Sequence, residues 1–214
     1  MVKICGIDEA GRGPVIGPMI IAGVLIDSVN VHKLKEIGVK DSKLLTKKKR
    51  EELFDKVIEI VDDYFIIEVD TLEIDEAVQS DTLNLNWLEA IKSAMIINKL
   101  SPEKAIVDCP SNNVLAYTEY MMNFVKEKNI ELVIEHGADK NYVEAGAASI
   151  LAKVVRDNKI KEIKAKINVD FGSGYPSDPK TQDFLRKQCK NYPEICRRSW
   201  ASYKNLNIGQ KKLI

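Results

Sequence analysis

Carboxylate side chains follow apolar segments at several points that lie far apart along the chain. Asp8 and Glu9 end the first apolar segment, Asp108 ends a short one near the middle, and Asp139 lies a few residues after the next. Open α/β sheets bind their ligands outside the carboxyl ends of the strands. If the segments before Asp8 and Asp108 are parallel neighbours, these two acids project into one cleft. An acid at the rim of an apolar core is costly unless it is paired or bound to a metal.

Oxygen ligands without nearby histidine or cysteine suit hard cations such as Mg²⁺ or Mn²⁺. Two such ions about 4 Å apart can activate water and stabilise a leaving oxygen in phosphodiester hydrolysis. An alternative stays open, because an Asp after a strand is often a turn former or a helix cap, and for Asp108 or Asp139 taken singly this is the commoner role. Taken together with Glu9, the acids favour a metal site.

The loop after the first acids contains Gly11, Arg12 and Gly13. Glycine tolerates unusual φ angles and allows a ligand to approach the backbone, so the amides of this loop can face outward. A simple tight turn between two strands is the alternative, although a turn alone requires neither the two preceding acids nor the arginine. Farther along, Lys153 and Arg156 follow a small-residue helix face, where they can face phosphates or pair with Asp157.

The elements that must position these residues alternate between strands and helices. A strand-rich start followed by crossovers predicts a mixed α/β sheet with helices on both faces. After residue 167 the turn-forming residues of 170–179 interrupt regular structure, and short basic helices close the chain. Strands are expected over 2–7, 19–26, 64–69, 104–108 and 131–135, and helices over 46–61, 74–78, 81–99, 114–128 and 143–167.

The composition is that of a water-soluble globular protein: of 214 residues, 45% are hydrophobic and 30% are charged. No apolar run approaches the roughly 20 residues of a membrane-spanning helix. The four cysteines are scattered without CxxC pairing, which favours a reduced, cytoplasmic setting. The net charge is zero, but the stretches 33–50 and 180–214 are basic and can hold a phosphate backbone. Solvated helix faces are the alternative for each run taken singly.

Several common catalytic signatures are missing from the sequence. It contains no GxxxxGK[ST], GxSxG or HExxH motif, and no GxGxxG opens a helix after a strand. The two histidines, His32 and His136, have no partners that would form a hydrolytic triad. Histidine-centred catalysis is therefore not expected.

Six motifs follow one another along nearly the whole chain. They are GIDEAGRGP (Gly6–Pro14), DSKLLT (Asp41–Thr46), VD (Val107–Asp108), AD (Ala138–Asp139), AASILAKVVRD (Ala147–Asp157) and GYPSDPKT (Gly174–Thr181). They stand in the order seen in type 2 ribonucleases H, and the chain resembles the ribonuclease HII family, in particular its archaeal branch.

The resemblance implies a ribonuclease H-like fold, a mixed five-stranded sheet flanked by helices. The catalytic domain would span residues 1–168, and 169–214 would form a small C-terminal helical region for substrate binding. The implied activity is endonucleolytic cleavage of RNA in RNA–DNA hybrids and at ribonucleotides embedded in duplex DNA, leaving 5′-phosphate and 3′-hydroxyl ends. This activity would remove primers and misincorporated ribonucleotides in replication and repair.

The resemblance also assigns roles to individual residues. Asp8, Glu9, Asp108 and Asp139 match the four acids that bind two divalent ions. Gly11, Arg12 and Gly13 match the loop that reads the ribose 2′-hydroxyl, and Tyr175 matches a tyrosine that stacks on the next sugar. Ser42 and Lys43 match a phosphate-holding position, although Leu44 replaces a second lysine that the family usually has.

The implied partners are RNA–DNA hybrids and ribonucleotide-containing duplexes. The protein is expected to act as a monomer and not to bind a membrane. The tail Gln210–Ile214 begins like a sliding-clamp peptide but stops before its aromatic pair, so a weak clamp contact or a frayed end is expected. Two other functions remain open. A DNA nuclease or junction resolvase would keep the fold, and a nucleic-acid binding module would use the acids only for structure.

Overall fold

The computed structural model describes residues 1–39 and 45–209, and these build a five-stranded mixed sheet in the order β3-β2-β1-β4-β5. β1 pairs antiparallel with β2 and parallel with β4, and β4 pairs parallel with β5. This arrangement confirms the predicted fold class, and it meets the condition under which Asp8 and Asp108 share one edge, namely that the first and fourth strands are parallel neighbours. The strands are β1 Lys3–Ala10, β2 Met19–Asp27, β3 Asp63–Val69, β4 Lys104–Asp108 and β5 Glu131–Glu135.

Helices connect the strands, and further helices follow the last strand along the sequence to the end of the described chain. Thr46 starts α2 as an N-cap, because its hydroxyl accepts a hydrogen bond from the Lys49 amide at 3.2 Å. The α-helices are α1 Val31–Glu36, α2 Lys47–Ile60, α3 Thr71–Gln79, α4 Leu85–Leu100, α5 Val114–Met122, α6 Ala138–Asn141, α7 Val143–Ile167, α8 Pro179–Lys187 and α9 Ala201–Gly209. Short 3-10 helices cover Ser28–Asn30, Cys189–Asn191 and Pro193–Ile195.

The chain forms two compact units. Unit 1 comprises Met1–Ala10, Ile20–Ile67 and Asn86–Val155, and unit 2 comprises Gly11–Met19, Glu68–Leu85 and Arg156–Ile214. These units are defined by packing and interleave along the sequence, so they do not test the domain boundary expected after residue 168, which stays a prediction.

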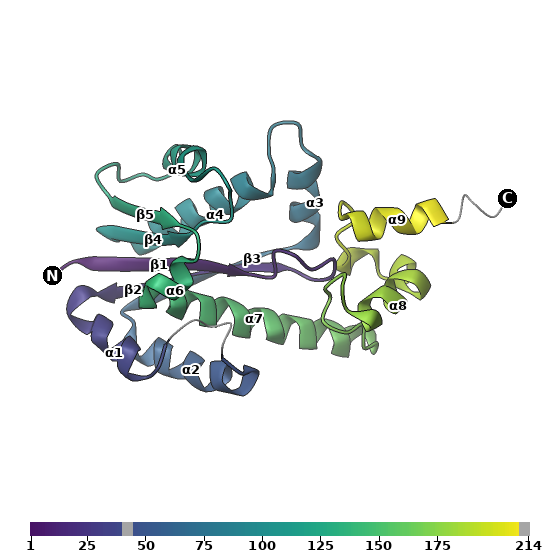
Figure 1. Cartoon of the computed structure of the whole chain (residues 1–214), viewed down its shortest axis with the longest axis horizontal. Coiled ribbons are helices and arrows are strands. Elements are labelled where there is room, and N and C mark those ends of the chain that lie inside the picture. The colour runs from purple at the N-terminus through teal and green to yellow at the C-terminus, as the bar shows by residue number, and fades with distance from the viewer. Residues whose placement is uncertain (40–44, 210–214) are drawn as a thin grey trace. The chain divides into compact units, whose positions relative to one another are not determined.

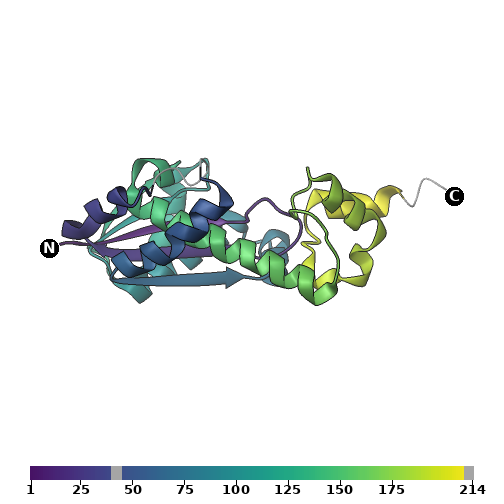
Figure 2. The same ribbon diagram turned by 90° about the horizontal axis from the view of Figure 1, so that it is seen from below.

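In unit 1, α4 and α5 cover one face of the sheet, and α1, α2 and the first part of α7 cover the other (Figures 1 and 2). The face beneath α2 and α7 is packed with fully buried aliphatic residues of β2 and α7, including Val24, Ile26 and Leu151. Gly6 lies where β1 meets the start of α7. A Cβ at this position would lie 2.1 Å from the Glu144 carbonyl carbon, so only glycine allows this close approach.

Unit 2 has a core of its own. Phe171 and Phe184 pack at a ring-centroid distance of 5.6 Å, and both are buried with Val15 and Ile16. An isolated bridge joins Ile16 to Cys196, so the segment after β1 is hydrogen-bonded to the C-terminal region within this unit.

The observed elements differ from the predictions at a few boundaries. β1 was expected to end at Ile7, yet it runs to Ala10 because β2 continues the antiparallel pairing as far as Ile20 opposite Ala10. The helix from Val114 ends at Met122 instead of Lys128. There the Asn98 side chain binds the Phe124 carbonyl and the Lys126 amide, both at 2.8 Å, and holds the chain in a turn. The four-residue α6 was not predicted.

Within residues 1–39 and 45–209, the helices are too short or too polar to cross a membrane.

Candidate metal centre

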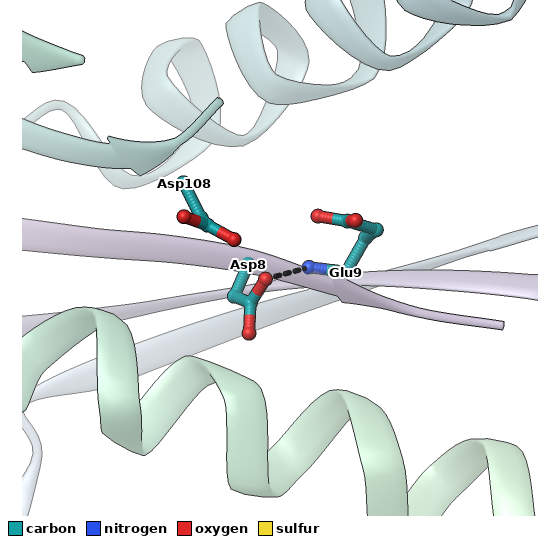
Figure 3. A group of neighbouring side chains, drawn as sticks. All are labelled: Asp8, Glu9 and Asp108. Atoms are coloured by element: carbon teal, nitrogen blue, oxygen red, sulfur yellow. Dashed lines mark hydrogen bonds between the residues drawn. The ribbon is translucent and has the colours of Figure 1, made fainter. Parts of the chain in front are cut away.

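Neighbouring strands place Asp8 and Asp108 at the same level of the sheet. Ile7 of β1 pairs with Val107 of β4, so the acid that follows each of them lies at the same edge. Successive side chains of a strand point to opposite faces, and accordingly Asp8 points toward α7 while Glu9 lies on the other side of β1 (Figure 3). The expected convergence of the first and fourth strand ends is therefore observed.

Asp8, Glu9 and Asp108 form a close carboxylate cluster. One oxygen from each side chain lies within 4.8 Å of the others. The backbone fixes two of the three acids: the Glu9 amide donates to Asp8 Oδ1 at 2.7 Å, and the Ala138 amide donates to Asp108 Oδ1 at 2.8 Å. The sequence folds this way because, after an initial lysine, β1 and β4 carry apolar residues and glycine up to these positions and place their acids at the edge of the core.

Asp8 is the most buried of the three, with 4% of its surface exposed. Burial raises the pKa of Asp8 well above its ordinary value, and the charges of Glu9 and Asp108 raise it further. Lys153 of α7 opposes this rise, because its Nζ lies 3.8 Å from Asp8 Oδ2, and a hydrogen bond with Ser149 also lowers the pKa. Lys153 in turn donates a hydrogen bond to Ser149. This lysine thus faces a carboxylate of the cluster.

The donor set fits hard divalent cations. Three carboxylates this close repel one another, and burial adds to the cost of their charge. Divalent cations coordinated by carboxylate oxygens would remove both penalties, whereas the cluster offers no nitrogen or sulfur ligand that would favour zinc. Asp8, Glu9 and Asp108 are therefore the residues that can hold such ions.

Asp139 is buried in the first turn of α6 and is not one of the three clustered acids found in the described ranges. Gly137 precedes α6 with a φ of 71°, which turns the chain from β5 into this short helix. The preceding residue, Ala138, makes the amide hydrogen bond to Asp108 and so ties α6 to the cluster. The role of Asp139 as a fourth metal ligand stays a prediction.

Glu89 of α4 is a carboxylate at the site that sequence reasoning missed. It is buried and lines a small cavity with the three clustered acids, together with Ser93 and Tyr117. Burial raises the pKa of Tyr117, and the neighbouring charges of Glu89 and Glu9 raise it further. The position of Glu89 between the apolar Leu88 and Ala90 was the only sequence signal that this acid is buried. It was not decisive, because an acid on a helix usually lies on a solvated face.

The residues expected to read the substrate lie in unit 2. Gly11 has a φ of 87°, and a Cβ there would lie 2.3 Å from Arg156 Nε. At Gly13, a Cβ would lie 3.6 Å from Tyr175 Cε1, so the loop and the tyrosine are neighbours. The Arg156 guanidinium lies 5.4 Å from the centre of the Tyr175 ring, and burial lowers the pKa of this arginine. The structure thus brings Gly11, Gly13 and Tyr175 together around Arg156.

The other two expected substrate residues, Ser42 and Lys43, lie outside the described residues, as does the tail Gln210–Ile214.

Comparison with known proteins gives one consistent result. A family model described as Ribonuclease HII matches residues 5–203. The chain is 47% identical over 210 residues to a ribonuclease HII of Methanococcus maripaludis (strain C7), a match that covers 95% of this chain and 86% of the relative. It is similar to the solved ribonuclease H2 of Pyrococcus horikoshii, with a TM-score of 0.88 and 42% identity over 98% of this chain and 99% of that one. It is also similar to a chain in the PCNA:RNase HII complex of Archaeoglobus fulgidus, with a TM-score of 0.83 and 36% identity over 94% and 95% of the two chains.

Proposed function

The chain belongs to the ribonuclease HII family and is a metal-dependent endoribonuclease, and from this premise we propose that it cleaves RNA–DNA hybrids and DNA duplexes at embedded ribonucleotides. The observation that carries the proposal is the cluster of Asp8, Glu9 and Asp108, whose carboxylate oxygens lie within 4.8 Å of one another. Hydrolysis would leave 5′-phosphate and 3′-hydroxyl ends, as required for removal of primers and misincorporated ribonucleotides.

Asp8, Glu9 and Asp108 would hold two divalent ions, Mg²⁺ or Mn²⁺, with Asp139 as a fourth ligand. When bound, such ions supply an activated water and stabilise the leaving oxygen of the phosphodiester. The protein contributes the fixed geometry. Backbone amides orient the carboxylates of Asp8 and Asp108 before the substrate arrives, which lowers the cost of organising the site. Lys153 compensates the negative charge of Asp8 on the side of α7.

Recognition of the ribose is assigned to Gly11, Arg12, Gly13 and Tyr175. Amide groups of a glycine loop can approach a 2′-hydroxyl, which distinguishes RNA from DNA, and an aromatic ring can stack on the adjoining sugar. Tyr175 is suited to this role because 41% of its surface is exposed, and the Arg156 guanidinium packs against its ring. Ser42 and Lys43 would add contacts to a phosphate.

The test is cleavage of a duplex that carries one ribonucleotide, with Mn²⁺, with Mg²⁺ and with a chelator, followed by mapping of the cut ends. We expect metal-dependent cleavage at the ribonucleotide and none in the same duplex made only of DNA. Asp108→Asn should abolish cleavage and leave binding of the duplex intact. Equal cutting of the all-DNA duplex would identify a DNA nuclease, and binding without cleavage by the wild type would identify a binding module.

The remaining assignments concern partners and setting. The solved Archaeoglobus fulgidus complex joins a ribonuclease HII to PCNA. By analogy, a weak clamp contact through Gln210–Ile214 is proposed for this chain. It is testable by measuring binding to a clamp with and without these five residues. A monomeric state and a cytoplasmic location stay predictions from the sequence.

A further inference from the structure

Arg197 holds the loop after β1 through the loop's carbonyl groups. Its two terminal nitrogens donate to the Gly11 oxygen at 2.6 Å and to the Arg12 oxygen at 2.8 Å, and its Nε donates to the Gly17 oxygen at 3.0 Å. All four residues belong to unit 2. One side chain therefore fixes both ends of the turn that contains the expected ribose-reading residues.

Trp200 completes this arrangement from the same C-terminal segment. Its indole nitrogen donates to the Gly13 oxygen at 3.1 Å, and its ring lies 4.9 Å from the Arg197 guanidinium carbon. Arg197 is 0% exposed. A buried guanidinium is costly unless hydrogen bonds satisfy it, so the three carbonyl contacts help to hold Arg197 in this position.

The segment that carries Arg197 is itself anchored. The Arg197 amide donates to the Val15 oxygen at 2.8 Å. The buried Asp75 of α3 accepts hydrogen bonds from the Arg198 amide at 2.7 Å, and from the Ser199 amide and hydroxyl at 2.9 and 2.5 Å. These bonds leave the backbone around Arg197 little freedom, so its guanidinium is placed before any ligand binds.

Because the peptide group is planar, fixing the direction of a carbonyl also fixes the direction of the N–H that follows it. In a trans peptide the C=O and the following N–H point in opposite directions. Since the Gly11 and Arg12 carbonyls point to Arg197, the N–H groups of Arg12 and Gly13 point away from it. The next residue, Pro14, has no N–H, so the oriented pair of amides ends at Gly13. Trp200 holds the carbonyl of this last residue.

We propose that Arg197, supported by Trp200, is a positioning residue that sets the preference for ribose over deoxyribose by orienting the Arg12 and Gly13 amides. The inference rests on the proposed function, in which this loop reads the 2′-hydroxyl. Neither side chain needs to touch the substrate for this role.

The test compares Arg197→Lys with Arg198→Lys, a matched pair that keeps the charge. Arg197→Lys replaces the guanidinium group that binds three carbonyls. Arg198→Lys makes the same change at a side chain that is largely exposed. Both are made in the Asp108→Asn background, which blocks cleavage. Fluorescence anisotropy then gives Kd for a duplex with one ribonucleotide and for the same duplex of DNA alone.

We expect Arg197→Lys to reduce the ratio of the two affinities about tenfold, with the all-DNA Kd changed less than about twofold. Arg198→Lys should leave the ratio unchanged. A merely structural role would lower the folded fraction and weaken both affinities alike, with a matching fall in Tm. Trp200→Phe, which keeps the ring but removes the N–H donor, should reduce the ratio about threefold and serves if Arg197→Lys does not fold.

An affinity ratio that survives in the folded Arg197→Lys and Trp200→Phe proteins overturns the positioning role while leaving the proposed function in place. A parent Asp108→Asn protein without any preference for the ribonucleotide, together with a wild type that does not cut there, overturns the proposed function and this inference with it.

Discussion

Removing one charge from the carboxylate cluster should stabilise the metal-free protein. Asp108→Asn is the suitable change, because the asparagine keeps an oxygen that can accept the hydrogen bond from the Ala138 amide. The substitution therefore removes repulsion from Asp8 and Glu9 without leaving a donor unpaired.

The expected size follows from the geometry of the cluster. Two ionised carboxylates whose oxygens lie within 4.8 Å of each other repel by about 3.5 kcal/mol or more at an effective dielectric constant of about 20. Asp108 is only half-buried, and Lys153 already compensates part of the charge, so solvent and this lysine reduce the gain to about 1–2 kcal/mol. For a chain of this size that corresponds to a rise in Tm of about 2–8 °C in EDTA.

Calorimetric Tm in EDTA and in saturating Mn²⁺ checks this reasoning. Free metal at a concentration of 100 times its Kd stabilises the wild type by about 2.7 kcal/mol. Asp108→Asn should lose most of this stabilisation. The variant is then more stable than the wild type without metal and responds less to its addition. Asp108→Ala is the matched control, because it leaves the Ala138 amide without its acceptor and should be less stable than Asp108→Asn by about 1–3 kcal/mol.

A Tm of Asp108→Asn in EDTA that equals or falls below that of the wild type would refute the predicted repulsion among the three carboxylates. An undiminished response to Mn²⁺ would remove Asp108 from the metal ligands.

Three further changes test other parts of the structure. Gly6→Ala should lower Tm by about 2–12 °C, because the new Cβ would lie 2.1 Å from the Glu144 carbonyl carbon; an unchanged Tm would contradict the close contact of β1 with α7. At Asp170, hydrogen bonds from two lysines lower the pKa, so its stabilising effect is present above the unfolded pKa of about 3.9 and is lost as the pH falls through the lowered value. Asp170→Asn should thus lower Tm at pH 7, and the difference from the wild type should shrink below about pH 4; a difference independent of pH would exclude this cause. Tyr175→Ala should slow cutting at a lone ribonucleotide by more than about tenfold, or 1.4 kcal/mol, whereas Tyr64→Ala, a change at a tyrosine of similar exposure, should have no effect. Equal rates for Tyr175→Ala and the wild type would exclude the stacking role.

Some elements could be predicted to the residue because local signals bound them. β4 ends at Asp108, before Cys109 and Pro110, since proline supplies no N–H for the ladder. The end of β1 could not be predicted in this way. Its last three residues, including both acids, are in the strand because β2 pairs with them, and that pairing is a tertiary contact.

The site divides in a similar manner. Asp8 and Asp108 could be expected to converge only on the condition that their strands are parallel neighbours, and the strand order that meets this condition is set by tertiary pairing. Glu89 could not be found from helical periodicity, because the sequence does not tell which helix face covers the cluster. Arg197 and Trp200 stand out in the sequence as a basic-aromatic segment, but the contacts of Arg197 could not be predicted, since arginine is rarely fully buried and its carbonyl acceptors lie up to 186 positions away.

That separation has a consequence during synthesis of the chain on the ribosome. At roughly 5–20 residues per second, the loop around Arg12 emerges about 10–40 seconds before Arg197 exists. Asp8, Glu9 and Asp108 have all been translated by about the midpoint, whereas Ala138 and Lys153, which hold and face these acids, follow later. A chain that stops just before Arg197 would keep all of these residues and lack the side chain that holds the loop around Arg12.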